Sequence, residues 1–148
     1  LLFNNPKIST ISNLYYNCHS RKDSTMNNNN SKKNLDIITI IEDLKQYAKQ
    51  NNLYDDNIIK YLIFDHILIT TINRVERQKN LEKSDVIKKL RSYCKQNLKN
   101  YKKQPFYKNV AKPRKMVANL NYIGLHKVSS ILIKLKSKLR KITTVIYK

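Results

Sequence analysis

The chain of 148 residues is long enough for one domain with a modest hydrophobic core. Its 30 lysines and arginines outnumber its 10 aspartates and glutamates, so the formal net charge is +20. All the acidic residues lie at or before Asp85, and residues 86–148 carry 18 basic side chains with no acidic one. This second half therefore favours an anionic partner, whether nucleic acid, a phospholipid surface or a phosphate-rich substrate. The single glycine excludes the glycine-rich loops that cradle phosphates in nucleotide-binding domains.

The sequence indicates neither a membrane-spanning helix nor a disulfide framework. Its apolar runs are far shorter than the roughly 20 residues that cross a bilayer, and no secretory signal peptide is visible. Cys18 and Cys94 lack the paired spacing of zinc sites, which favours free thiols in a reducing compartment. We expect a protein that is soluble or bound to a surface.

The first predicted element is a short extended segment, because apolar and polar residues alternate over 7–12. A polar loop without periodicity follows and contains His19, Arg21 and Ser24. Arg21 offers a planar fork that matches phosphate oxygens, and Ser24 offers a small donor. His19 could donate to phosphate or, when neutral, ligate a divalent ion. Taken alone, the pattern H-x-R-x-x-S is also typical of a solvated loop.

Two helices are predicted next, after a polar connector rich in asparagine. The first covers 34–50 with one apolar stripe, and Asn34 is its candidate N-cap. The second covers 55–78, with Asp55 at its N-terminus, and its middle is apolar on most faces, so it should be the buried central helix. His66 lies inside this apolar run, where a hydrogen-bonded core or interfacial histidine is expected rather than a metal ligand.

A third helix is predicted from Ser84, its candidate N-cap, to about residue 98. Cys94 falls on its apolar stripe and is expected to be a small core residue. A basic connector over 99–111 follows, and it contains Tyr101, Phe106 and Tyr107. Aromatic rings among lysines can stack on nucleic-acid bases, or they can anchor a loop onto the core, which is the favoured alternative.

The last two predicted helices are a short one from Pro113 to a stop at Gly124 and a basic amphipathic one over 125–142. The final helix suits a membrane interface, where its stripe would sink into the acyl boundary. An ordinary helix that packs its stripe on the preceding helices is about equally favoured. The apolar stripe comprises Val128, Ile131, Leu132, Leu135, Leu139 and Ile142. The expected membrane-surface residues are Lys134, Lys136, Lys138, Arg140 and Lys141.

The tract from Tyr16 to Met26 resembles a segment of bacterial family 2 glycosyltransferases, which use nucleotide-sugar donors. Members of that family tend to read Pro-Leu-Tyr-x-Tyr-Arg-x-Arg-x-x-Ser-Ile-Met. This chain keeps Tyr16, Arg21, Ser24 and Met26. It has His19 where arginine is common, Cys18 at the second aromatic position and Leu14 where proline usually falls. The later stretches N-N-L-Y-D, N-Y-K-K and L-N-Y-I-G-L are similar to the family in style.

The resemblance implies a role for the loop that closes over the donor. His19, Arg21 and Ser24 would bind the donor diphosphate and stabilise the charge that grows on it as the sugar bond breaks. The catalytic base, the acidic motif for Mg²⁺ or Mn²⁺ and the nucleotide pocket would lie upstream, in a region that this chain lacks. Because the chain begins at Leu1 without a methionine, we expect a fragment that is inactive alone and holds no metal itself.

The predicted fold is mainly α, with an extended remnant of a larger α/β transferase domain followed by a bundle of about five helices. Three parts are expected: residues 1–33 as the tail of the catalytic domain, 34–111 as a three-helix subdomain and 112–148 as a basic helical tail. The parent enzyme would move a sugar from a nucleotide-sugar donor to a cell-surface glycan or lipid-linked acceptor. It would lie in the cytoplasm, peripherally on the inner face of the cell membrane.

A second hypothesis is a small basic helical protein that binds nucleic acid. The charge of residues 86–148 and the interleaved tyrosines would serve phosphate contacts and stacking. No helix-turn-helix, zinc-finger or RNA-module signature is visible in the sequence, and the aliphatic stripe of the last helix suits lipid better than bases. A helical scaffold is a third hypothesis, but it explains neither the charge nor the loop.

Overall fold

The computed structural model describes residues 31–135, and within that range every regular element is a helix. The mainly helical fold is therefore confirmed. The extended segment expected over 7–12, and the loop with His19, Arg21 and Ser24, lie outside the described residues. The α-helices are α1 (Asp36–Gln50), α2 (Asp56–Leu62), α3 (Ile72–Arg77), α4 (Lys83–Asn97), α5 (Pro105–Asn109) and α6 (Lys112–Ile123).

Four further helical stretches complete the description. A 3₁₀ turn over Ser31–Leu35 leads into α1, and another over Tyr101–Lys103 precedes α5. A π-helical segment, Ile63–Thr71, joins α2 to α3, so residues 56–77 form one continuous helix. Residues 126–135 are helical and are called the last helix here. All five expected helices are present, and α5 is an addition within the connector.

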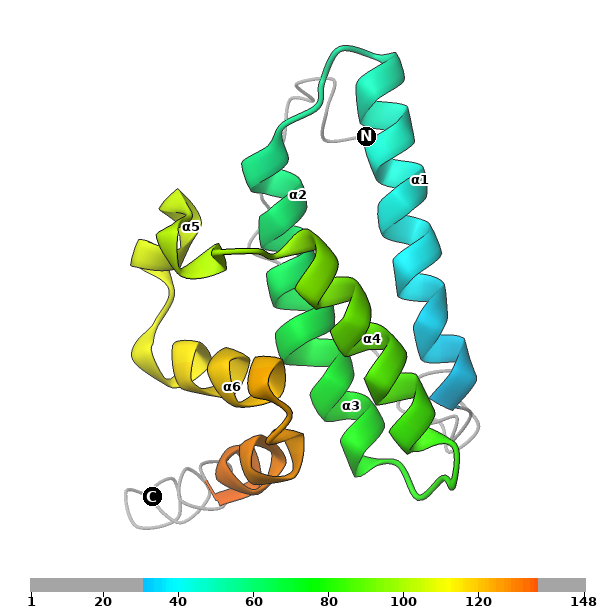
Figure 1. Ribbon diagram of the computed structural model, residues 1–148, viewed down its shortest axis with the longest axis vertical. Helices are drawn as coiled ribbons and strands as arrows, with labels where there is room; N and C mark the ends of the chain where they lie inside the picture. The colour runs from blue at the N-terminus through cyan, green and yellow to red at the C-terminus, as the bar shows by residue number, and fades with distance from the viewer. Residues whose placement is uncertain (1–30, 136–148) are drawn as a thin grey trace, which may run out of the picture.

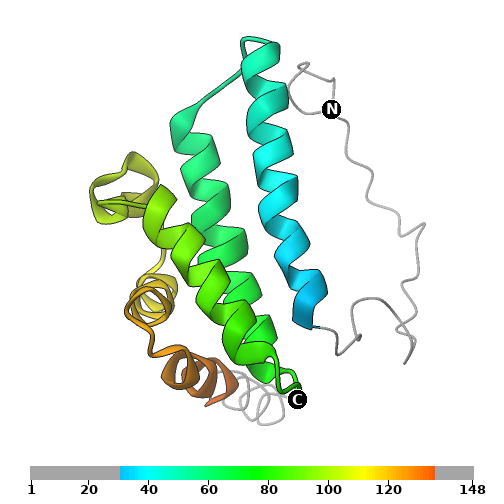
Figure 2. The ribbon, with the colours of Figure 1, turned by 45° about the vertical axis from the view of Figure 1, so that its right-hand side comes forward.

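The continuous helix of residues 56–77 runs through the centre of the molecule. In Figures 1 and 2, α1 lies beside it in the opposite direction and α4 packs along it at an angle. Phe64, Ile67, Leu68 and Ile72 are each 0% exposed, because their neighbours come from several surrounding helices. The prediction of a buried central helix is confirmed, and burial of this apolar surface is the main stabilising contribution to the fold.

The expectation of a core position for His66 is wrong, because this side chain is exposed. His66 falls on a narrow stripe with Thr70, Arg74 and Arg77, all of them exposed, at helical spacing along the central helix. Its backbone carbonyl does take part in the structure, since it accepts a hydrogen bond of 2.7 Å from Thr71 Oγ1. That bond gives the buried Thr71 hydroxyl a partner within the π-helical segment.

The helix ends agree with the sequence in two cases and differ in two. Asp55 caps α2, because its carboxylate accepts hydrogen bonds from the backbone N–H groups of residues 57 and 58. Gly124 ends α6 in the left-handed region with φ of 105°. Asn34 does not cap α1, because the 3₁₀ turn begins before it and its amide donates to the Ser31 carbonyl. Ser84 is not a cap either, since α4 already begins at Lys83.

The aromatic residues of the connector pack on the central helix. Tyr101 is 4% exposed, and its ring centroid lies 5.7 Å from that of Phe64 and 5.1 Å from that of Tyr122. Tyr107 meets Tyr101 edge to face at 5.6 Å. These contacts match the loop-anchoring alternative, and they hold α5 and α6 against one side of the bundle.

Candidate functional site

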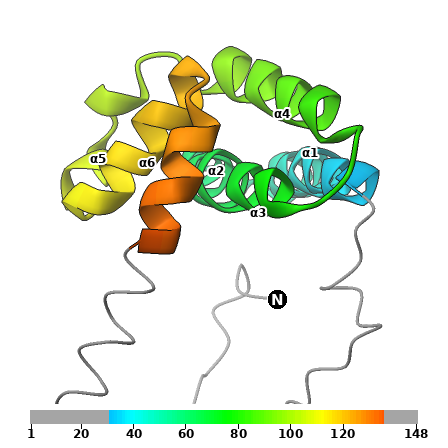
Figure 3. The same ribbon diagram turned by 90° about the horizontal axis from the view of Figure 1, so that it is seen from below.

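The last helix packs on the molecule through a face that carries both serines and apolar side chains. Ser129 is 0% and Ser130 is 5% exposed, and Ile133 packs against the core from the same side. In Figure 3 this helix, drawn in orange, crosses α6 at one side of the bundle. Of the predicted stripe, Val128, Ile131 and Leu135 are exposed and Leu132 is partly buried, so its described residues mostly face away from the bundle.

Exposed apolar residues lie on the other side of the last helix, with Leu125 directly before its first residue. Their spacing of three or four residues places them along one face, which we call the apolar row. Leu132, which the predicted stripe also included, is partly buried, while Leu139 and Ile142 lie outside the described residues. The row consists of Leu125, Val128, Ile131 and Leu135, which are 49%, 43%, 56% and 52% exposed.

Basic residues accompany the apolar row. Lys127 and Lys134 are exposed and seven residues apart, so they share one side of the helix. Lys134 is the one predicted membrane-surface residue within the described range, and its exposure suits that role. Lys136, Lys138, Arg140 and Lys141 lie outside the described residues. No acidic residue occurs in the sequence after Asp85 to offset these charges.

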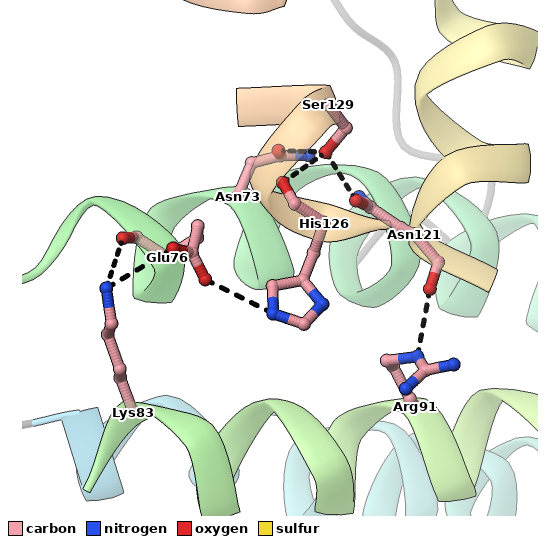
Figure 4. Close-up of polar contacts among 7 residues, drawn as sticks. All are labelled: Asn73, Glu76, Lys83, Arg91, Asn121, His126 and Ser129. Carbon is pink, nitrogen blue, oxygen red and sulfur yellow. Dashed lines mark hydrogen bonds and ion pairs between the residues drawn. The ribbon is translucent and has the colours of Figure 1, made fainter. Parts of the chain in front are cut away.

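A buried hydrogen-bond network fixes the orientation of the last helix (Figure 4). Ser129 Oγ lies 2.8 Å from Asn73 Oδ1 in α3 and 2.5 Å from Asn121 Oδ1 in α6. The two asparagines are themselves buried, and their amide groups donate to the carbonyls of Ile69 and Leu68, each at 2.7 Å. The network therefore joins three helices at one serine, and burial makes its loss expensive.

Arg91 of α4 supports the turn between α6 and the last helix. Its Nε donates to the Asn121 carbonyl at 3.0 Å and its Nη2 to the Tyr122 carbonyl at 3.2 Å, at the negative end of α6. A Cβ on Gly124 would lie 2.8 Å from Arg91 Nη2. Glycine is favoured here by its positive φ, and an added Cβ would also require the end of the Arg91 side chain to shift.

An ionic group lies beside this network. Glu76 Oε1 lies 3.2 Å from Lys83 Nζ, and Glu76 Oε2 lies 3.4 Å from His126 Nε2 at the start of the last helix. Burial lowers the pKa of His126, and the neighbouring Glu76 carboxylate partly opposes that shift. His126 is therefore neutral at neutral pH, and a fall in pH would place a charge at the base of the last helix.

Sequence reasoning missed Asn73, Asn121 and Ser129, although each carries a usable signal. They are small polar residues that interrupt apolar stretches, and such residues are buried only where a partner satisfies them. Cys94 was placed correctly: it is buried in the core, and that burial raises the pKa of its thiol to about 12.

Neither a metal-binding cluster nor a membrane-spanning helix occurs among the described residues. Between residues 31 and 135, no group of three or more histidine, cysteine, aspartate or glutamate side chains could hold a metal ion. In the same range, no helix has the length and apolar character needed to span a bilayer. Comparisons of the chain with protein-family models, with curated proteins and with solved structures found no match.

Proposed function

We propose that the last helix attaches this chain to an anionic membrane surface, as part of a glycosyltransferase that uses nucleotide-sugar donors. The observation that carries the proposal is the exposed apolar row on a helix whose other face, with Ser129, Ser130 and Ile133, packs on the bundle. A helix that is held in this way presents its apolar side chains outward without needing to unfold or rotate.

Two attractions would act together at the membrane. The row can enter the boundary between headgroups and acyl chains, where apolar area gains about 25 cal/mol per Å² removed from water. Each lysine or arginine near an anionic leaflet adds about 1 kcal/mol. Lys127 and Lys134 are exposed on this helix, and Lys136, Lys138, Arg140 and Lys141 continue the basic sequence. Charge and apolar area are therefore both required for stable binding.

The enzymatic part of the proposal is supported by the tract from Tyr16 to Met26. Its similarity to family 2 glycosyltransferases assigns His19, Arg21 and Ser24 to the donor diphosphate. The parent enzyme would use Mg²⁺ or Mn²⁺ and would act at the inner face of the membrane on a glycan or lipid-linked acceptor. Attachment through the last helix would hold the enzyme close to such an acceptor.

In the full-length parent, Arg21→Ala is expected to reduce turnover more than it weakens acceptor binding. The guanidinium would be needed mainly as charge develops on the leaving diphosphate, so its loss should lower kcat rather than raise KM for the acceptor. Ser24→Ala should have a milder effect. Steady-state kinetics with a nucleotide-sugar donor test this, and unchanged turnover in the Arg21 variant would remove the loop from the mechanism.

Nucleic-acid binding is the second candidate function, and the charge of residues 86–148 favours it. Two aromatic rings of the connector give it less support. Tyr101 is buried and Tyr107 packs against it, so neither presents an open ring face to a base. The apolar row would also serve no purpose in phosphate contacts.

A vesicle-binding experiment separates these functions. The double variant Ile131→Ser, Leu135→Ser keeps the net charge and removes half of the apolar row. We expect it to bind vesicles of phosphatidylserine and phosphatidylcholine about tenfold more weakly than the unaltered chain. The matched control is Ile40→Ser, Ile58→Ser, which removes two exposed isoleucines from α1 and α2 and should leave binding unchanged.

The same chains are titrated with single-stranded RNA at two salt concentrations. Strong RNA binding that falls steeply with salt, without vesicle binding, would favour the nucleic-acid function and overturn the membrane proposal. Equal vesicle binding by the double variant and the unaltered chain would also contradict it.

A further inference from the structure

A cleft of about 560 Å³ lies beside the central helix, on elements that the apolar row does not use. Its volume is within the range of small-molecule sites in proteins. We propose that this cleft binds a neutral saccharide unit of the acceptor, an inference that rests on the proposed glycosyltransferase function. The cleft is lined by Tyr61, Asp65, Phe106, Asn109, Val110, Ala111 and Arg114.

An anchored aromatic ring forms the apolar side of the cleft. Tyr61 is 43% exposed, and its ring meets the Phe106 ring at 5.7 Å and 66°. Phe106 in turn lies 5.4 Å from the buried ring of Phe64, so this wall is fixed to the core. An open, rigid aromatic face suits the C–H face of a pyranose ring, because it offers apolar contact at little entropic cost.

Planar polar groups form the other side. Arg114 Nη2 donates to Asp65 Oδ1 in an ion pair between α6 and the central helix. Within the described residues no further hydrogen bond joins either side chain to the protein. The second carboxylate oxygen and the other guanidinium donors can therefore serve a ligand, together with the amide of Asn109. Such paired donors and acceptors match adjacent hydroxyl groups of a sugar.

The balance of charge selects a neutral ligand. Asp65 neutralises Arg114, so a diphosphate would meet a carboxylate as well as a cation. A purely apolar ligand would remove water from the ion pair and give no hydrogen bonds in return. A polyhydroxylated ring satisfies both walls. The cleft is thus suited to the acceptor, and the donor diphosphate is assigned to the loop with Arg21.

The test is an NMR titration of the full 148-residue chain, labelled with ¹⁵N, against maltotriose, cellotriose, chitotriose and lactose. We expect at least one of these sugars to produce saturable shifts in the amide signals of residues 106–111, with millimolar affinity. Tyr61→Ala should weaken this binding about tenfold. The matched control is Tyr47→Ala on α1, which removes a tyrosine that is 46% exposed and should leave the affinity unchanged.

A second variant, Ala111→Leu, places a larger side chain at the exposed rim of the cleft and removes no core contact. We expect it to abolish the saturable shifts. It decides the matter if Tyr61→Ala does not fold. Absence of saturable shifts with all four sugars, or equal binding by both cleft variants, would overturn the proposal. Vesicle binding and the effect of Arg21→Ala do not depend on the cleft. A failure of the proposed function would therefore be distinguished from a failure of the saccharide proposal.

Discussion

Ser129 is the residue on which the orientation of the last helix depends most. Its hydroxyl is within hydrogen-bond distance of two buried amide oxygens from different helices. We expect Ser129→Ala to lower the free energy of unfolding by about 1–3 kcal/mol, because the hydroxyl carries one proton and its removal leaves a buried amide oxygen without that donor. Urea denaturation followed by circular dichroism measures this. Ser92→Ala, at an exposed position of α4, is the control and should change stability by less than about 0.5 kcal/mol.

His126 should make stability depend on pH. Its pKa in the folded protein is lowered from 6.5, first by burial and then by the nearby charges of Arg91 and Lys127, while Glu76 acts in the opposite direction. The unfolded state therefore binds the proton more readily. The stabilising contribution of the neutral ring is fully present above about pH 6.5 and is lost as the pH falls through the folded-state pKa.

The measurement is urea unfolding of the unaltered chain and of His126→Gln between pH 7.5 and 5. Glutamine cannot gain the proton, so we expect the variant to lose less stability than the unaltered chain as the pH falls across this window. The contact of Lys83 with Glu76 is common to both proteins, so the difference between the two profiles reports on residue 126. Parallel pH profiles for the two proteins would contradict the assignment.

The turn between α6 and the last helix is fixed by Gly124. We expect Gly124→Ala to lower the free energy of unfolding by about 1–3 kcal/mol, because alanine is strained at positive φ and its Cβ would meet Arg91. Thermal unfolding gives the size of the effect. Ala111→Gly, at an exposed position before α6, controls for a general effect of glycine and alanine exchange.

The elements could be predicted from the sequence to different depths. The central helix could be predicted from its apolar middle, but its π-helical segment could not. A π-helix shifts the spacing of apolar residues, and that shift cannot be recognised in a helix that is apolar on most faces. The stripe of the last helix was also evident. Which way the stripe faces could not be predicted, because the spacing alone does not tell whether protein or solvent covers it. The orientation depends on Ser129, whose partners lie 56 and 8 residues away in the sequence.

The cleft had no signal in the sequence for a related reason. Its walls come from Tyr61 and Asp65 in one helix and from residues 106–114 far along the chain. The packing of the connector on Phe64 and the ion pair between Arg114 and Asp65 bring them together. The aromatic residues of the connector anchor it to the core, as the sequence predicted. That Phe106 also lines a cleft depends on the fold and could not be predicted.

At the scale of the whole molecule, the proposed membrane-binding helix lies at one end. In Figure 1 the connection between α1 and α2 lies at the opposite end of the molecule from the last helix. If the last helix is the membrane-binding part, the end with that connection should stay in water. The absence of tryptophan from the chain allows each end to be probed by a single introduced indole.

Fluorescence of Val128→Trp on anionic vesicles tests the membrane proposal most directly. Val128 belongs to the apolar row and is 43% exposed, and Tyr54, before α2, is 41% exposed and provides the matched probe Tyr54→Trp. We predict that the emission of Val128→Trp shifts to the blue and is quenched by lipids brominated on their acyl chains, because the row enters the interface. Tyr54→Trp should show neither change. If Val128→Trp keeps the emission it has in water, or if both probes are quenched equally, the last helix is not the membrane-binding element.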